Sequence, residues 1–130
     1  ATPPIHIGIV DVRDVAIAHA EAVERQDASG RYILCAGGRW IGEIADVLRR
    51  AFPDYKVPRF TMPAAAMYVV ALFSKRMSLS MVKRLVNNPV MVDATRSKLE
   101  LGLGYRPVDV SIREAVTVMV DDGLARARLR

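Results

Sequence analysis

Residues 32–48, YILCAGGRWIGEIADVL, join a short apolar run to a helical pattern through two glycines. The run from Tyr32 to Cys35 is typical of a buried strand, and from Ile41 onward apolar residues recur at helical spacing. Glycines at such a junction let a helix N-terminus approach an anion, as in dinucleotide-binding folds. The stretch therefore indicates an α/β protein and raises the question whether the two glycines hold a cofactor.

The spacing of these glycines argues against a cofactor site. Gly37, Gly38 and Gly42 form G-G-x-x-x-G, which is neither the dinucleotide fingerprint G-x-G-x-x-G nor a P-loop. No acidic residue ends a second strand about 20 residues later, where a ribose would be bound, because Asp54 follows a helix end and a proline. The sequence predicts a turn at these glycines and no cofactor-binding residue in the chain.

The segment before this stretch predicts a strand followed by a helix. Residues 5–10 alternate and are rich in β-branched side chains, which favours a strand. Asp11 is placed to cap a helix that ends near Gln26, with Asp14 as the acidic partner of a variant capping box. The predicted buried face of this helix comprises Val12, Val15, Ala16, His19, Ala22 and Val23.

The second half of the chain predicts mostly helices. We expect helices over residues 41–52 and 63–74, from Ser78 or Ser80 to 86, over 94–101 after a cap at Asp93, and from Ile112 after a capping box of Ser111 and Glu114. One further strand is predicted over residues 89–94. Because three or four short strands make a poor sheet and open edges need covering, we expect part of the sheet to lie outside this chain. The start at Ala1 without methionine also suggests a piece of something longer.

Composition and charge exclude several classes of partner. The net charge is +5, but the basic residues are scattered rather than interleaved with aromatics, so we expect no nucleic-acid partner. The longest nearly apolar run, residues 62–73, is too short to span a bilayer, so we expect no membrane partner. A single cysteine, Cys35, excludes an internal disulfide and a cysteine-based zinc site and is consistent with a cytoplasmic protein.

Few side chains are arranged for chemistry. His6 and His19 cannot form a metal pair at helical spacing, and His19 is interpreted as a hydrogen-bonded core residue, so no metal site is predicted. The spacing of Asp11 and Asp14 is explained by helix capping rather than by acid–base catalysis. Methionines recur over the apolar helices at positions 62, 67, 77 and 81; they favour core packing, or else line an adaptable pocket for an apolar substrate.

Three segments in order carry a resemblance to a known family. VDVRDVAIAH (10–19), ASGRY (28–32) and FPDYKVP (52–58) resemble the C-terminal part of the extended short-chain dehydrogenase/reductases. The similarity is greatest to the branch of dihydroflavonol, cinnamoyl-CoA and aldehyde reductases, within the NAD-dependent epimerase/dehydratase family. It extends over most of the chain.

The resemblance implies an α/β fold that is the C-terminal portion of a Rossmann-like reductase, mostly helical with a few short strands. Residues 1–130 would form one substrate-binding region. It would include residues 31–35 as the last strand of the Rossmann-type sheet, and the helix from Asp11 as the last helix that accompanies this sheet. Strands around Ile9 and Met91 would pair in the small substrate domain. The cofactor, NADP or NAD, would be bound by an N-terminal domain absent from this chain.

The resemblance also fixes which site residues are expected. No tyrosine in the sequence has a lysine four residues later, so the catalytic Tyr-x-x-x-Lys pair of the family is missing and no catalytic residue is carried over. Ile9, Met62 and Met67 are expected to line the substrate site. The implied partners are a small carbonyl substrate and the missing Rossmann domain.

The expected function is therefore the substrate-binding portion of an NAD(P)H-dependent oxidoreductase that reduces an aldehyde or a ketone and is inactive by itself. One alternative is part of a nucleotide-sugar epimerase or dehydratase. The pairs Arg49-Arg50, Lys75-Arg76 and Lys83-Arg84 could bind the diphosphate of such a substrate, although FPDYKVP favours the reductases. Another is a stand-alone binding module that forms a homodimer through its open sheet edge. The sequence leaves the substrate and the choice between NAD and NADP open.

Overall fold

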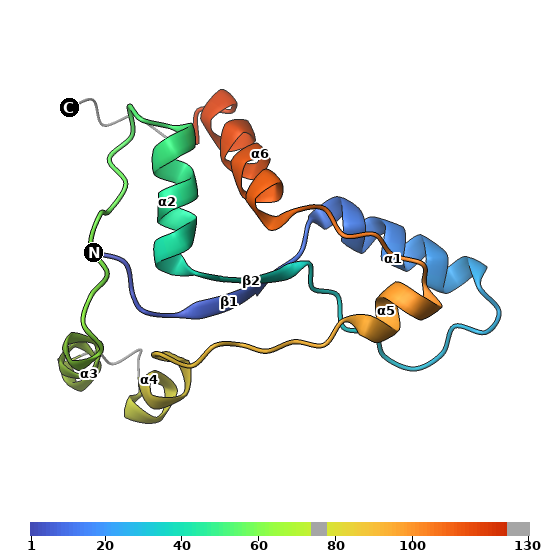
Figure 1. Cartoon of the computed structure of the whole chain (residues 1–130), viewed down its shortest axis with the longest axis horizontal. Coiled ribbons are helices and arrows are strands. Elements are labelled where there is room, and N and C mark those ends of the chain that lie inside the picture. Colours follow the sequence, from blue (N-terminus) through green and yellow to red (C-terminus); the bar gives the residue numbers. More distant parts are fainter. Residues whose placement is uncertain (74–77, 125–130) are drawn as a thin grey trace.

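The computed structural model of the chain describes residues 1–73 and 78–124 and contains two short strands and six helices in that part. Figure 1 shows them along the chain. The elements are β1 (His6–Ile9), α1 (Val12–Glu24), β2 (Gly37–Trp40), α2 (Ile41–Ala51), α3 (Ala64–Phe73), α4 (Leu79–Leu85), α5 (Thr95–Glu100) and α6 (Val108–Asp121).

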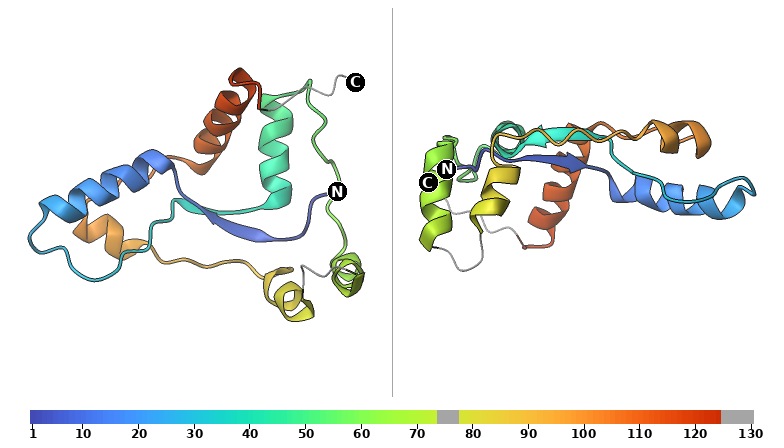
Figure 2. Two further views of the ribbon diagram at one scale, coloured as in Figure 1. Left: turned by 180° about the vertical axis from the view of Figure 1, so that it is seen from behind. Right: turned by 90° about the horizontal axis from the view of Figure 1, so that it is seen from below.

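A two-stranded antiparallel ribbon lies at the centre of the molecule. β1 pairs with β2 so that His6 faces Trp40 and Ile9 faces Gly37. The prediction of a turn at the two glycines is therefore wrong, because Gly37 and Gly38 form half of a strand. Figure 2 shows the ribbon from behind, with α1 and α5 beyond one end and α3 and α4 beyond the other.

Two predicted strands do not form. Residues 31–35 and 89–94 have no strand neighbour within the described part of the chain, and strands need such a neighbour for their backbone hydrogen bonds. The carbonyl of Ile33 instead accepts a hydrogen bond from Ser97 Oγ at 2.9 Å. Ile9 pairs with Gly37 and not with Met91, which is exposed, so the predicted pairing around these two residues is also wrong.

The first helix is predicted at the right place but with the wrong buried face. Asp11 caps it by accepting from the backbone N–H of Arg13 at 2.9 Å. Asp14 and Ala18 are its buried residues, whereas Val12 and Val23 are exposed. His19 is exposed as well and is not a core histidine. The apolar stripe predicted the helix but could not decide which side the rest of the chain would cover.

The later helices follow their local signals closely, with one exception. Ser78 caps α4, and Asp93 Oδ1 accepts from Thr95 N at 2.8 Å at the start of α5. The final helix α6 begins at Val108, directly after Pro107, and not at the predicted capping box of Ser111 and Glu114. Pro107 is the N-cap residue, and its carbonyl accepts from the backbone N–H groups of Val110 and Ser111, so the helix begins one turn earlier than predicted.

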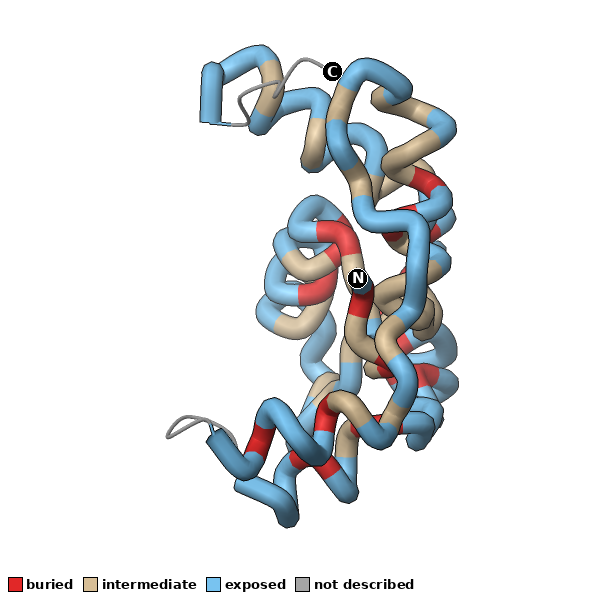
Figure 3. Tube along the Cα trace, turned by 90° about the vertical axis from the view of Figure 1, so that its left-hand side faces the viewer, coloured by how far each residue is buried: buried red, intermediate tan, exposed pale blue. Residues whose placement is uncertain are grey.

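Many of the buried apolar residues belong to two small groups rather than to one core. The first lies between α3 and α4 and contains Met67, Ala71, Val82 and Val86. The second joins α1 to the α5 region and contains Ala18, Leu101 and Leu103. Figure 3 shows that buried segments are short and that exposed chain separates them.

The chain exposes more surface than a compact monomer of the same mass. The chain exposes 9300 Å² of surface. A compact monomer of 14.3 kDa exposes roughly 6800 Å² by the usual scaling. Within residues 1–73 and 78–124, no helix combines the length and the apolar character needed to cross a membrane.

Candidate substrate-binding site

A cavity of about 390 Å³ lies along α2, and we call it the α2 groove. α2 forms one wall and the extended segment 58–61 forms the opposite wall, while residues near the N-terminus and Asn87 close it. The lining residues are Thr2, Pro3, Pro4, Trp40, Gly42, Glu43, Asp46, Arg49, Pro58, Arg59, Thr61 and Asn87. This volume is within the range of small-molecule sites.

Local sequence explains how the two walls come together. Positions 42, 46 and 49 lie on one face of α2, because residues three and four apart share a helix face. The backbone N–H of Thr2 donates to Phe60 O at 2.8 Å, and that of Met62 donates to Thr2 O at 2.8 Å. Gly42 allows the close approach, since a Cβ there would lie 3.1 Å from Thr61 Oγ1.

The charges in the α2 groove are unevenly satisfied. Glu43 Oε2 accepts from the backbone N–H of Trp40 at 2.8 Å, which caps α2. Asp46 forms an ion pair with a terminal nitrogen of Arg49. The Nε of Arg49 is buried and makes no hydrogen bond to any residue that the structure describes. Arg49 therefore keeps one buried donor that has no acceptor in this part of the chain.

A second cavity, of about 510 Å³, lies between the end of β1, the start of α1 and α6. Ile9 lines it together with Arg13 and Ile112, among others. Arg13 Nε donates to Asp11 Oδ1 at 2.8 Å, and its Nη2 donates to Glu114 Oε2 at 2.5 Å. These groups join α1 to α6 at the rim of the cavity.

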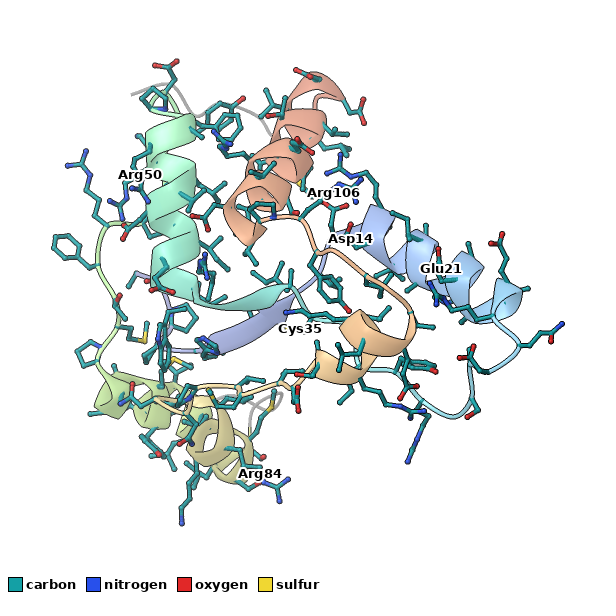
Figure 4. All side chains as sticks on the ribbon, turned by 45° about the vertical axis from the view of Figure 1, so that its right-hand side comes forward. Asp14, Glu21, Cys35, Arg50, Arg84 and Arg106 are labelled. Atoms are coloured by element: carbon teal, nitrogen blue, oxygen red, sulfur yellow. The ribbon has the colours of Figure 1, made fainter. Side chains whose placement is uncertain are left out.

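The two aspartates at the start of α1 have structural roles. The hydrogen bond from the Arg13 side chain, with smaller contributions from Ser111 and the Arg13 backbone, holds the pKa of Asp11 well below its usual range. Asp14 is buried, accepts from the backbone N–H of Arg106 at 2.8 Å and forms an ion pair with the Arg106 guanidinium. Figure 4 labels Asp14 and Arg106 and shows them beside each other. The capping-box role predicted for Asp14 is thus replaced by a link to the segment before α6.

The residues expected to line a substrate site lie in two places. Ile9 lines the cavity beside α6, whereas Met67 is buried between α3 and α4 and Met62 packs against that group. The structure does not bring Ile9 into one cavity with the two methionines. Met81 is half exposed, and Met77 lies outside the described residues.

Sequence reasoning missed the α2 groove. Its signal was present in the polar face of α2, where Glu43, Asp46 and Arg49 recur at helical spacing, but such a face usually meets solvent. The partner wall comes from residues 58–61, and their position relative to α2 has no local sequence signal. In the part of the chain that the structure describes, no three metal-ligating side chains gather at one point.

No family model matches the chain, but curated reductases do. Cinnamoyl-CoA reductase 2 of Arabidopsis thaliana is 31% identical over 114 residues, which are 88% of this chain and 29% of that protein. Cinnamoyl-CoA reductase 1 of Arabidopsis thaliana is 49% identical over 49 residues, or 38% of this chain and 14% of its own length. A (2S)-flavan-3-ol-forming anthocyanidin reductase of Vitis vinifera is 44% identical over 52 residues, 40% of this chain and 15% of its own. The chain spans less than a third of these relatives.

Solved structures match the fold over nearly the whole chain. The structure of gox2253 matches with a TM-score of 0.75 and 22% identity, over 95% of this chain and 40% of that one. That of Gre2 from Candida albicans matches with a TM-score of 0.67 and 27% identity, over 95% of this chain and 33% of its own. The Candida albicans protein has also been solved in complex with NADPH, and that structure matches with a TM-score of 0.64.

The match to cinnamoyl-CoA reductase 2 and the fold matches extend over most of the same 130 residues, and both point to one group of Rossmann-fold reductases. Its members that match here are several times longer than the segment they share with this chain. The chain belongs to the extended short-chain dehydrogenase/reductases, in the branch similar to dihydroflavonol reductase, and corresponds to the C-terminal part of such a protein.

Proposed function

We propose that this chain is the substrate-binding portion of an NAD(P)H-dependent oxidoreductase that reduces an aldehyde or a ketone. The observation that carries the proposal is the 31% identity to cinnamoyl-CoA reductase 2 over 88% of the chain. The Candida albicans Gre2 complex with NADPH supports a nicotinamide cofactor, most directly NADPH. A cytoplasmic location is part of the proposal, because a single cysteine fits a reducing compartment.

The cofactor-binding and catalytic groups belong to residues outside these 130. No tyrosine here has a lysine four residues later, and the glycines of the central stretch form a strand rather than a phosphate-binding turn. When bound, the cofactor supplies the hydride for carbonyl reduction. The role of this chain is to bind and orient the carbonyl compound and to keep water away from it. Ile9, Met62 and Met67 remain the proposed lining residues.

The open parts of the surface support a proposal for the domain organisation. We propose that residues 1–130 form one C-terminal region that packs on a Rossmann domain, with residues 31–35 as the last strand of its sheet. Ile33 is more than half exposed and its segment forms no strand in this chain. The surface of 9300 Å², well above that of a compact monomer of this mass, supports such a neighbour.

The proposal is tested by extending the coding region upstream of Ala1 and comparing the product with the 130-residue chain. We expect a Tyr-x-x-x-Lys motif upstream, NADPH consumption with aldehydes by the extended protein, and none by the 130 residues. Replacing the upstream tyrosine with phenylalanine should abolish turnover while NADPH binding persists. Carbonyl reduction by the 130-residue chain, or an extended protein that binds NADPH and reduces no carbonyl compound, would contradict the proposal.

A further inference from the structure

We propose that the outer face of α3 binds the surface of a membrane that contains anionic lipids. This face is formed by Ala65, Val69, Leu72 and Phe73, and we call it the α3 face. It belongs to the chain itself, so its binding does not depend on the reductase proposal. Two features of the molecule support it: exposed apolar side chains on α3 and a purely basic sequence around that helix.

α3 is apolar on all sides, but the chain covers only one of them. Apart from the hydroxyl of Tyr68, the helix carries no polar side chain. Its buried residues, Met67 and Ala71, pack in one group with Val82 and Val86. A helix that is apolar all round is normally buried all round. The side of α3 that faces away from α4 therefore lacks a cover in this chain.

The α3 face lies on this uncovered side. Positions 65, 69, 72 and 73 share one face of the helix, because residues three and four apart lie above one another. Val69, Leu72 and Phe73 are 53%, 67% and 87% exposed, respectively. Leu79, at the start of α4, is 48% exposed as well. Exposed apolar residues that gather in this way mark an interaction surface.

The charge of the surrounding sequence indicates what that surface meets. Between Asp54 and Asp93 the sequence contains six basic residues and no acidic residue, whereas the rest of the chain holds 13 basic and 14 acidic residues. The net positive charge therefore comes from this segment alone. Lys83 and Arg84 are exposed on α4 and form no ion pair with any described residue. Figure 4 shows Arg84 on the outside of α4, away from the ribbon.

An anionic bilayer surface fits both features. Leucine, valine and phenylalanine side chains enter the boundary between headgroups and acyl chains, while nearby lysines and arginines attract anionic lipids. We expected no membrane partner because residues 62–73 are too short to cross a bilayer. A helix that lies on the surface needs no such length, so the short run is compatible with this kind of binding.

The charge and the layout favour a membrane over two other occupants. A second copy paired face to face would bring two equally basic segments together, and like charges across an interface are unfavourable. The proposed Rossmann domain would continue a sheet at residues 31–35. That segment contacts α5 through the hydrogen bond from Ser97 to Ile33, and α5 lies beyond the opposite end of the ribbon from α3 (Figure 2).

Sedimentation with vesicles tests the proposal on the 130-residue chain and on the product extended upstream of Ala1. We expect both proteins to bind vesicles of equal parts phosphatidylglycerol and phosphatidylcholine. Binding to phosphatidylcholine alone should be about tenfold weaker or more, because the basic side chains lose their anionic partners. Added salt should weaken binding to the anionic vesicles, since it screens the attraction.

A double variant of the α3 face tests the apolar contribution. Leu72→Ser combined with Phe73→Ser should weaken binding to the anionic vesicles about tenfold or more, because two large side chains no longer leave water. Leu99→Ser is the matched control, since Leu99 is 78% exposed on α5 and should not affect binding. Far-ultraviolet circular dichroism checks that each variant is folded.

A second double variant separates the basic segment from general attraction to a basic protein. Lys83→Gln combined with Arg84→Gln should weaken binding to the anionic vesicles about tenfold. Lys98→Gln combined with Arg113→Gln removes the same charge from exposed positions on α5 and α6 and should change binding much less. Equal effects of the two double variants would show that only the net charge matters, which contradicts the proposal.

Three further results would overturn the proposal. The first is equal binding to the two kinds of vesicle, or full binding by the folded variant with serines at 72 and 73. The second is binding by the 130-residue chain but not by the extended protein, since the rest of that protein would then cover the α3 face. The third is a protein that binds no vesicle and forms a dimer in size-exclusion experiments that the two serines abolish, which would assign the α3 face to a second copy.

Discussion

In the central ribbon, the imidazole of His6 packs against Gly38. The imidazole covers Gly38, where a Cβ would lie 2.0 Å from His6 Cε1. On its other side, Nδ1 of His6 accepts from the backbone N–H of Val90 at 3.0 Å. His6 therefore connects the extended run before α5 to the ribbon, and the absence of a side chain at position 38 makes room for it.

This contact predicts a large effect from a single methyl group. Gly38→Ala should destabilise the chain by about 1–3 kcal/mol, because the ring or the ribbon must move to admit the Cβ. Gly104→Ala is the matched control, since a Cβ there meets nothing within 4 Å. Urea denaturation followed by circular dichroism measures both. Adding His6→Ala to Gly38→Ala should reduce the cost of the glycine replacement, and an additive pair would contradict the contact.

Asp14 gives a second prediction at this scale. Its carboxylate is buried and satisfies both the backbone N–H and the guanidinium of Arg106. Asp14→Ala leaves these donors without an acceptor and should cost about 1–3 kcal/mol of unfolding free energy. Asp109→Ala, which removes an exposed pair with Arg39, should cost at most about 1 kcal/mol. If the two replacements lowered the stability equally in thermal unfolding, burial of Asp14 would add nothing to the unfolding free energy.

At the scale of whole elements, α1 and α6 are joined by a small ionic network. Asp11 accepts from Arg13, and Arg13 continues to Glu114 on α6. The network links the first turn of α1 to the middle of α6, at the rim of the cavity that Ile9 and Ile112 line. Its stability depends on the ionised form of Asp11.

This dependence predicts how stability responds to acid. Hydrogen bonds from Arg13 and Ser111 lower the pKa of Asp11 in the folded chain, whereas an unfolded aspartate has a pKa of about 3.9. The stabilisation is thus complete well above that value and is lost as the pH falls below it. The melting temperature should decrease below about pH 4, and Asp11→Asn should make this decrease shallower. Asp54→Asn, at an exposed position, should leave the slope unchanged; an equal change in both variants would contradict the role of Asp11.

The helices were largely predictable because their signals are local. Ser78 caps α4 and Gly102, at a backbone φ of +66°, follows the end of α5, both as the residue types indicate. The start of α6 was missed because two local signals competed, and Pro107 prevailed over the capping box at Ser111. The strand predicted at 31–35 failed for a different reason: no partner strand lies in the described part of the chain.

At the scale of the whole molecule, the segment 31–35 is the feature most sensitive to a neighbour. Its backbone N–H groups donate to no described residue, although its side chains are mostly apolar. We expect amide hydrogens of residues 32–35 to exchange rapidly in the 130-residue chain and to become protected in the product extended upstream of Ala1. The amides of Ala36 and Ile41, which bond to β1 and the residue before it, should be protected in both.

Hydrogen exchange followed by mass spectrometry of short peptides resolves these positions. Protection of residues 32–35 in the 130-residue chain at high dilution would show that the segment needs no added sheet. Protection that appears only as the concentration of this chain rises would assign the neighbour to a second copy and not to a Rossmann domain. The extended protein distinguishes a Rossmann domain from a second copy of the chain, because protection by a domain of the same protein should not depend on concentration.

The sequence by itself determined the α/β class, the position of β1, the bounds of most helices and the family, because caps, periodicity and motifs are written in neighbouring residues. It did not determine that Gly37 and Gly38 form a strand, that α1 buries Asp14 and Ala18, or that α2 faces segment 58–61 across a groove. Those features depend on residues far apart in the chain. The pairing of His6 with Trp40, the Asp14–Arg106 link and the bridge from Thr2 to Phe60 exist only once the chain has folded, and the tertiary structure alone decided them.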